Sequence, residues 1–298
     1  MEFSVESSFP FNFKTVVTSH GWCQVKPFHW REEEETLEYI LELSNRRVIR
    51  LEMEGDQNGF KVKTGNLSRL ERIETEQKLH WMFGTDIDLS LFYKAIKGTS
   101  QLAHAKKKSM GRVLRSPTLF EDVVRTILTT NTLWSATIRM TNKLVEQFGE
   151  SLPQDPELQA FPTPSRLAQT NEDNLRSETR LGYRAPYILE LARRIDSNDL
   201  DLESLKTSDL PIQELRNELL KINGIGPYAA ANLLMILGRS DYLPIDSWAL
   251  KVVSHEWFNG EPIKPSQVQE VFDKWGEWKG LVFWCWDWKL FHENDDKK

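Results

Sequence analysis

The stretch best suited to chemistry is Gly224-Ile225-Gly226, which is followed further along the chain by Pro244-Ile245-Asp246. Glycines allow the chain to reverse tightly and bring backbone N–H groups close to an anion, and the N-terminus of a following helix adds a favourable dipole. Such a turn can hold a phosphate group through the backbone alone. A plain turn between two helices fits Gly-x-Gly equally well.

Asp246 also has two interpretations. An aspartate directly before a helix is a favoured N-cap, and most such residues do nothing else. A carboxylate at this place could instead stabilise a developing positive charge or orient a water molecule. The local pattern leaves both open.

The elements that position these residues are predicted from hydrophobic periodicity. Up to about Lys97, alternating stretches flank turn signals such as Asp56-Gln57-Asn58-Gly59, which is typical of antiparallel hairpins. From about Ser116 the period becomes helical, and a proline-rich connector is expected over 152–164. The later helices are predicted at 120–128, 138–148, 187–195, 212–222, 228–237 and 248–257.

The fold class is therefore α+β, with an N-terminal antiparallel sheet region followed by a mainly α-helical body that contains a helix-hairpin-helix motif. We predict an N-terminal α+β domain over residues 1–100 and a helical domain over 101–298. The last segment of the helical domain is expected to pack back on the N-terminal domain.

The amino-acid composition favours a globular protein and excludes several other classes. With 40% hydrophobic and 28% charged residues the chain is an ordinary globular protein. No apolar run approaches the roughly 20 residues of a membrane-spanning helix. Cys23 and Cys285 are isolated, so a four-cysteine zinc site is excluded. The N-terminus lacks the pattern of a secretory signal, and we expect the protein to remain inside the cell.

Charge is unevenly distributed along this chain of net charge −6. Between Gln101 and Gly149, three acidic residues are outnumbered by eight cations, which are Lys106, Lys107, Lys108, Arg112, Arg115, Arg125, Arg139 and Lys143. This basic segment could contact phosphates or form a solvated helical surface.

Taken together, Leu219 to Asn232 and Leu243 to Leu250 resemble the helix-hairpin-helix DNA glycosylase superfamily, which includes the 3-methyladenine and 8-oxoguanine DNA glycosylases. Residues 111–149 and Leu181-Gly182-Tyr183-Arg184-Ala185 are similar to further segments of those enzymes. The resemblance covers roughly residues 111–290.

The resemblance implies a role for each matching residue. Asp246 is the catalytic carboxylate, and Gly224, Ile225 and Gly226 bind DNA. Asn131 fills the gap left by a flipped nucleotide, Tyr183 wedges the helix, and Arg184 contacts the widowed base. Backbone carbonyls of Ile222 and Ile225 could hold a structural monovalent cation. No organic cofactor and no side-chain metal site are implied.

The sequence departs from the family pattern at two places. Bifunctional members carry a lysine where this chain has Tyr228, which cannot form a Schiff base. The nearest positions to the two residues with which the 8-oxoguanine branch recognises its base are Val25 and Gly280. An aromatic base pocket of Tyr228, Trp134, Trp248 and Trp284 would favour cationic or electron-poor bases, although tryptophans near the C-terminus could equally belong to the core.

We therefore predict a monofunctional DNA glycosylase, a hydrolase without AP-lyase activity, that excises damaged, alkylated purines from duplex DNA in base excision repair. Two alternatives stay open, namely an 8-oxoguanine-type glycosylase with an altered pocket and a noncatalytic DNA-damage-binding protein. The expected partner is double-stranded DNA with a damaged base, bound by a monomer without membrane contact. The expected location is the cytoplasm, at the nucleoid, in a prokaryote and the nucleus in a eukaryote.

Overall fold

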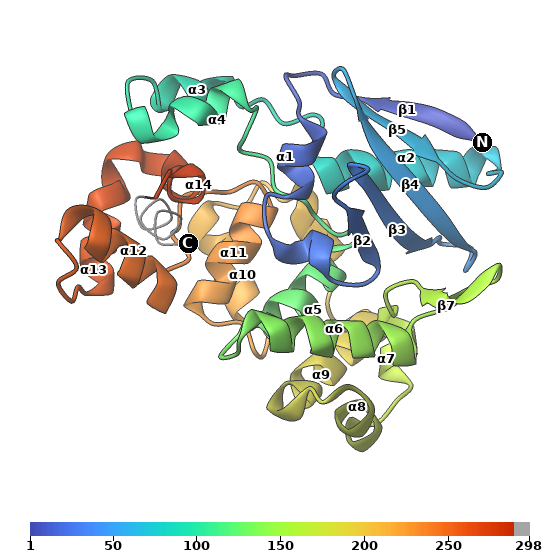
Figure 1. Ribbon diagram of the computed structural model, residues 1–298. Helices are drawn as coiled ribbons and strands as arrows, with labels where there is room; N and C mark the ends of the chain where they lie inside the picture. The colour runs from blue at the N-terminus through green and yellow to red at the C-terminus, as the bar shows by residue number, and fades with distance from the viewer. Residues whose placement is uncertain (289–298) are drawn as a thin grey trace. The chain divides into compact units, whose positions relative to one another are not determined.

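The computed structural model describes residues 1–288, which form two compact units (Figure 1). The first unit comprises Met1–Ile87, Arg112–Asp209 and Lys221–Gly224. The second comprises Asp88–Gly111, Leu210–Leu220 and the chain from Ile225 onward. These units interleave along the chain, whereas the boundary predicted at residue 100 divides the sequence only once. Residues 289–298 of the predicted helical domain lie outside the described residues.

A five-stranded antiparallel sheet dominates the beginning of the first unit, with strand order β1-β5-β4-β3-β2. Val5 and Phe60 are register partners across β1 and β5, and both are buried. The turn between β4 and β5 uses Gln57 and Asn58, as the hairpin signal predicts. The strands are β1 (Glu2–Glu6), β2 (Phe28–Arg31), β3 (Thr36–Glu42), β4 (Val48–Asp56) and β5 (Gly59–Lys63).

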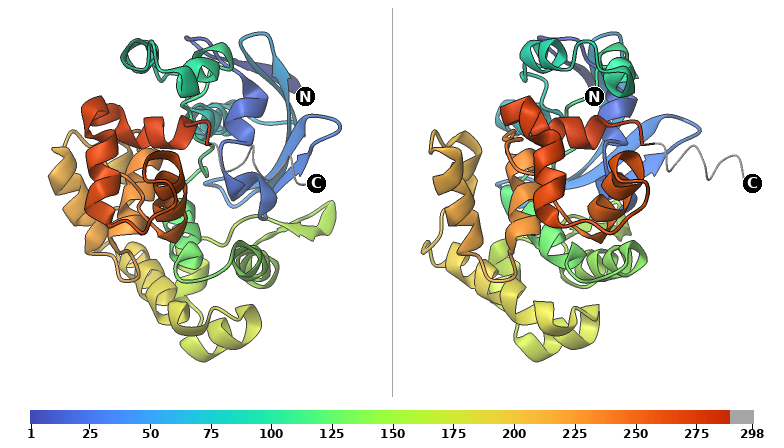
Figure 2. Two further views of the ribbon diagram at one scale, coloured as in Figure 1. Left: turned by 60° about the vertical axis from the view of Figure 1, so that its left-hand side comes forward. Right: turned by 90° about the vertical axis from the view of Figure 1, so that its left-hand side faces the viewer.

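Helix α2 (Arg69–Phe83) lies against this sheet (Figures 1 and 2). Ser68 and Glu71 form a reciprocal capping box at its start, and Gly84 ends it in a left-handed conformation. Phe83 brings its ring to 4.2 Å from that of Phe60 and stacks on Phe13 at 5.4 Å. Aromatic packing therefore fixes α2 on the sheet.

The remainder of the first unit is mainly helical, and α5, α6 and α9 lie where the sequence predicts helices. Phe120, Val123, Val124, Ile127 and Leu128 are all buried on α5. The predicted connector over 152–164 is wrong in one respect, because a small antiparallel pair of strands forms there. The elements are α1 (Phe13–Val17), η1 (Gly21–Gln24), α5 (Leu119–Thr129), α6 (Trp134–Phe148), β6 (Ser151–Leu152), β7 (Asp155–Gln159), α7 (Pro164–Ala168), α8 (Glu172–Thr179), η3 (Gly182–Arg184), α9 (Ala185–Asp196) and η4 (Glu203–Thr207).

The second unit contains helices only among its described residues. Its core is aromatic: Phe272 contacts Trp257, Trp275, Phe283 and Trp286 at ring-centroid distances of 5.5 to 5.9 Å. The helices are α3 (Ser90–Ala95), η2 (Ser100–Leu102), α4 (Ala103–Lys107), α10 (Ile212–Leu220), α11 (Pro227–Ile236), α12 (Ser247–Trp257), α13 (Pro265–Phe272), η5 (Asp273–Trp278) and α14 (Lys279–Cys285). None of the helices within residues 1–288 is long and apolar enough to cross a membrane.

Candidate functional site

The turn between α10 and α11 needs a glycine at position 224. Gly224 has φ +91°, and a Cβ there would lie 2.9 Å from Cδ2 of Tyr187. Backbone conformation and crowding therefore both exclude a side chain. Ile222 and Ile225 are buried, so their side chains anchor the turn on either side of this glycine.

Gly226 differs from Gly224. It is the N-cap of α11 with φ −97° and ψ −176°, an extended conformation that any residue adopts. A Cβ at this position would meet no atom within 4 Å. Folding does not require this glycine, and its missing side chain leaves space in front of the first N–H groups of a ten-residue helix.

Asp246 caps α12, as the N-cap interpretation predicts. Its Oδ1 accepts a hydrogen bond from the backbone N–H of Ala249 at 2.8 Å. Its Oδ2 accepts no hydrogen bond from the described part of the chain. Leu243 and Pro244, just before it, are buried, whereas Asp246 itself is only half-buried. The carboxylate is thus held by one oxygen and retains an acceptor for another molecule.

Tyr228, in the first turn of α11, lies within electrostatic reach of Asp246. Burial raises the pKa of its phenol, and the negative charge of Asp246 raises that pKa further, against a hydrogen bond from Asn232. The phenol therefore stays protonated at neutral pH. The residue that replaces the family's lysine is a neutral, half-buried hydroxyl beside the candidate carboxylate.

Three of the residues predicted for an aromatic base pocket, Tyr228, Trp248 and Trp284, belong to the second unit. Trp248 is 41% exposed and meets the ring of Phe283 edge-on at 5.9 Å. Trp284 is half-buried on α14. Phe283, Trp286 and Trp288 are buried, so the core interpretation holds for these three.

Trp134 belongs to the first unit, at the start of α6, and is held from three sides. Its indole N–H donates to Oε1 of Gln24 at 2.8 Å, and its ring stacks on Trp22 at 6.3 Å. A Cβ at Gly21 would lie 2.2 Å from the indole ring, so only glycine admits it. Sequence reasoning missed Gly21, Trp22 and Gln24, for which the only local signal is a glycine beside a tryptophan.

The loop between α5 and α6 is tied to the segment that contains Tyr183 and Arg184. Both side chains donate to the carbonyl oxygen of Thr130, Tyr183 at 3.5 Å. Asn131 is exposed and has φ +48°, in the left-handed region. Tyr183 is 47% exposed, whereas Arg184 is buried with its guanidinium 4.5 Å from the Tyr183 ring. Three residues predicted to act together are therefore adjacent, with Arg184 engaged by the loop backbone.

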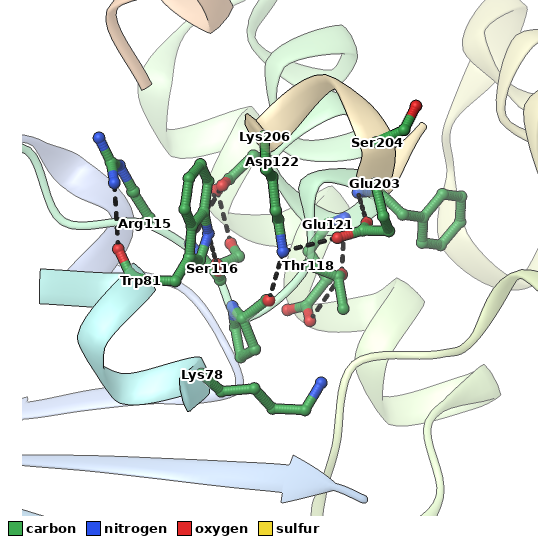
Figure 3. Close-up of polar contacts among 12 residues, drawn as sticks. Lys78, Trp81, Arg115, Ser116, Thr118, Glu121, Asp122, Glu203, Ser204 and Lys206 are labelled. Atoms are coloured by element: carbon green, nitrogen blue, oxygen red, sulfur yellow. Dashed lines mark hydrogen bonds and ion pairs between the residues drawn. The ribbon is translucent and has the colours of Figure 1, made fainter. Parts of the chain in front are cut away.

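The basic segment is only partly available to a phosphate, which corrects the prediction for its three central arginines. Arg112, Arg115 and Arg125 are 3%, 5% and 0% exposed. Arg112 donates to carbonyls of Gly84, Pro10 and Ile87, and Arg115 donates to that of Trp81 (Figure 3). These guanidiniums donate to backbone carbonyls near the ends of neighbouring helices. Burial lowers the pKa of Arg115 to about 10.

Arg125 belongs to a buried polar network that sequence reasoning also missed. Its Nη1 donates to Oγ of Ser116 at 3.1 Å, and Glu121 lies 3.6 Å from Nη2. Asp122 accepts from Ser116 and from the indole of Trp22 (Figure 3 shows the Ser116 contact). Burial raises the pKa of both carboxyls, Glu121 and Asp122. Charged residues inside a predicted amphipathic helix were the available signal.

Comparisons with known proteins agree with this arrangement. Residues 124–277 match the model of the HhH-GPD superfamily of base excision DNA repair proteins. The chain is 28% identical over 224 residues to a DNA-3-methyladenine glycosylase of Bacillus subtilis, covering 72% of each chain. It is 25% identical to an N-glycosylase/DNA lyase of Saccharomyces cerevisiae, with 78% of this chain and 70% of that one covered.

Solved structures show the same fold. A 3-methyladenine DNA glycosylase from Archaeoglobus fulgidus has a TM-score of 0.75 at 20% identity, covering 95% of this chain and 97% of its own. An 8-oxoguanine glycosylase/lyase from Clostridium acetobutylicum has a TM-score of 0.72 at 20% identity, covering 96% and 97%. Since the family model spans more than half of the chain, this protein belongs to the HhH-GPD superfamily of base excision DNA repair proteins.

Proposed function

We propose that this protein is a monofunctional DNA glycosylase that releases damaged, alkylated purines from duplex DNA by hydrolysis of the N-glycosidic bond. The observation that carries the proposal is the pairing of Asp246, a carboxylate with one oxygen unused, with Tyr228 at the position of the family's lysine.

Asp246 supplies the negative charge that the reaction needs. As the bond between the sugar C1′ and the base nitrogen breaks, its electron pair leaves with the base and the sugar becomes oxocarbenium-like. The carboxylate stabilises that cation, and its unused oxygen accepts a proton from the attacking water. The water oxygen bonds to C1′, and the released base takes up a proton.

Tyr228 is the residue from which we infer that the reaction has no lyase step. A lyase needs an amine that attacks C1′ and forms a Schiff base, and a phenol has no nitrogen to do so. The protonated hydroxyl beside Asp246 can instead donate a hydrogen bond to the carboxylate, the water or the departing base.

Gripping DNA and extruding the base are assigned to different residues. The open space at Gly226 lets a phosphate approach the N-terminus of α11, where backbone N–H groups and the helix dipole favour an anion. Asn131 and Tyr183 are exposed and would enter the duplex, offsetting part of the few kcal/mol that flipping costs. Arg184 supports both residues, and it must leave the carbonyls of Thr130 and Asn131 to contact the widowed base.

The substrate class is inferred from the aromatic side chains and from Gly280. Within the second unit, Trp248, Trp284 and Tyr228 offer electron-rich faces that favour cationic alkylated purines. Trp134, the fourth residue of the predicted set, belongs to the first unit. A Cβ at Gly280 would lie 2.7 and 2.9 Å from the carbonyl oxygens of Ser240 and Tyr242. The position nearest to the glutamine of the 8-oxoguanine branch therefore has no room for a side chain, and Val25 is 1% exposed.

An 8-oxoguanine-type activity is the second candidate, because relatives and structural neighbours with that name or a lyase name also match. A noncatalytic damage sensor is less well supported, since it would not need a carboxylate with an unused oxygen.

A monovalent cation is compatible with the turn. The carbonyl oxygens of Ile222 and Ile225 accept no backbone hydrogen bond from the described residues, so both remain available as ligands. We include such a cation in the proposal as a structural support for the hairpin, with no part in the chemistry.

The test uses duplexes that each carry one lesion, either 3-methyladenine, 7-methylguanine, hypoxanthine or 8-oxoguanine, followed by alkaline cleavage of abasic sites. We expect strand cleavage only after alkali, and for the alkylated bases first. Borohydride should trap no covalent adduct. A trapped adduct would overturn the monofunctional assignment, and release of 8-oxoguanine alone would overturn the substrate class.

A further inference from the structure

Residues 88–111 carry a concentration of positive charge that the hairpin chemistry does not use. Five lysines and one aspartate give this stretch a net charge of +4 in a chain of net charge −6. It precedes residues 124–277, the part that matches the family model. All five lysines are exposed. We name Lys94, Lys97, Lys106, Lys107 and Lys108 the lysine segment.

The lysine segment is held on a folded support. Phe92 is fully buried and its ring lies 5.9 Å from that of Trp278 in the same unit. The backbone N–H of Asp287 donates to the carbonyl of Gln101 at 3.2 Å. The positive charges therefore occupy defined places on the second unit, which reduces the entropy lost on binding a partner.

The two helical segments that carry the lysines are tied together because the stretch closes on itself. Helices α3 and α4 lie side by side in Figure 1, where both are labelled, and the hydroxyl of Tyr93 donates to the carbonyl of Met110 at 2.9 Å. This bond joins the residue before Lys94 to the loop that follows Lys108. Two short helical segments that each carry exposed lysines are therefore joined within one folded stretch.

The lysine segment also lacks the acidic partners that other lysines have. Lys14, Lys26 and Lys279 each lie 2.7 to 3.0 Å from a carboxylate. None of the five lysines forms an ion pair with a described residue. The consecutive charges of Lys106, Lys107 and Lys108 repel one another, and a polyanion removes that repulsion while releasing its own condensed counterions.

We propose that the lysine segment binds the phosphodiester backbone of duplex DNA, adding sequence-independent affinity to that of the hairpin. Lysine is a flexible point charge, suited to phosphates and poor at reading base edges. The choice of DNA as the polyanion rests on the proposed function. The surface itself follows from the charge, exposure and packing described above.

The test compares two double variants that remove the same charge. K107Q/K108Q alters the lysine segment, and K61Q/K63Q alters two exposed lysines on β5 of the other unit. Binding of an undamaged duplex is measured from 50 to 200 mM salt. We expect K107Q/K108Q to lower the slope of log K against log salt by about 1 to 2, at roughly 0.9 per lost phosphate contact. K61Q/K63Q should leave the slope unchanged.

A second measurement uses the unaltered chain. Labelling with an amine-reactive reagent should be reduced at Lys106, Lys107 and Lys108 by saturating duplex, and unchanged at Lys61 and Lys63. Equal labelling with and without duplex, or a wild-type slope for K107Q/K108Q, overturns the proposal. Protection by single-stranded RNA or an acidic protein in place of duplex DNA also overturns it.

The excision reaction separates this inference from the proposed function. Under single-turnover conditions with saturating enzyme, K107Q/K108Q should release the base at the wild-type rate. A reduced slope in a protein that excises no base would support the lysine segment and contradict the glycosylase. Excision with an unchanged slope would do the reverse.

Discussion

Asp122 in the first unit and Asp246 in the second are aspartates at the N-terminal ends of helices, with opposite surroundings. Asp122 is 0% exposed, and its Oδ1 accepts from Trp22, from the Ser116 N–H and from the Ser116 hydroxyl at 2.6 to 3.0 Å. Its Oδ2 shares the Ser116 N–H at 3.2 Å. Asp246 is half-buried and accepts one hydrogen bond, at Oδ1. A carboxylate whose acceptors are all used stabilises the fold, whereas one with an unused oxygen is available for chemistry.

Changing Asp246 to asparagine should give the largest effect. We expect base release to fall about 10⁴-fold, equal to about 5.5 kcal/mol in activation free energy, because the amide carries no charge. Asparagine caps helices as well as aspartate does, so the free energy of unfolding should change by less than about 0.5 kcal/mol. Single-turnover excision measures the change in rate, and urea unfolding measures the change in the free energy of unfolding. Lesion binding should survive, and turnover above a tenth of wild type would remove Asp246 from the mechanism.

The same change at Asp122 should act on stability alone. Asp122→Asn replaces a buried acceptor oxygen by a donor and removes the charge near Arg125, which should cost about 3 kcal/mol of unfolding free energy. The rate of excision per folded molecule should stay near wild type. Trp22→Phe is the milder companion, which removes one donor and should cost about 1 kcal/mol. A stable Asp122→Asn protein that has lost activity would break the comparison.

His20, a residue of the first unit, should make the stability of the protein depend on pH. Burial lowers its pKa from 6.5 to about 4, against the opposing hydrogen bond with the Leu114 carbonyl, which lies 2.6 Å from Nε2. Because the folded protein binds its proton less readily than the unfolded chain, stability should fall by about 2.5 kcal/mol as the pH drops from 6.5 to 4. His20→Gln should flatten that part of the stability curve, measured by denaturant unfolding at each pH. An unchanged curve would show that His20 does not titrate in this range.

The two glycines of the turn should respond to substitution in opposite ways. Gly226→Val should fold with wild-type stability but bind damaged and undamaged duplexes about tenfold more weakly, because its side chain occupies the approach to α11. Gly224→Ala should instead lose about 1 to 3 kcal/mol of stability, since it forces a side chain into φ +91° beside Tyr187. Wild-type DNA binding by folded Gly226→Val would return the hairpin to a plain helix–helix turn.

Tyr183→Ala tests whether binding to the DNA backbone and flipping of the damaged base depend on different residues. Tyr183 is 47% exposed, so its loss should leave stability nearly unchanged. We expect lesion binding and excision to fall about tenfold while affinity for undamaged duplex stays the same, since stacking is lost only in the flipped complex. Parallel titrations of the two duplexes check this, and an equal loss for both would assign Tyr183 to the backbone contacts.

Periodicity and turn chemistry, which act over a few residues, determined the elements of this protein. The hairpin at Gln57 and Asn58, the α5 face and the N-cap at Asp246 are all local, and each is present as predicted. The resemblance in the hairpin and in Pro-x-Asp likewise gave the family from residues close in sequence. Strands β6 and β7 were not predicted from the sequence, because Pro153 and Pro156 are typical of a connector.

Which charges are buried was decided only by tertiary structure. Arg112, Arg115 and Arg125 have the same charge as Lys106 to Lys108, yet the arginines serve as donors to carbonyls from segments far away in sequence. The roles of Gly21 and Gly280 were likewise set by contacts with distant Trp134 and Ser240. The local sequence sets the backbone conformation that each residue prefers. Burial and unused hydrogen-bonding capacity depend instead on which residues, distant in sequence, pack against that residue. This is why Asp122 and Asp246 differ although both lie at the start of a helix.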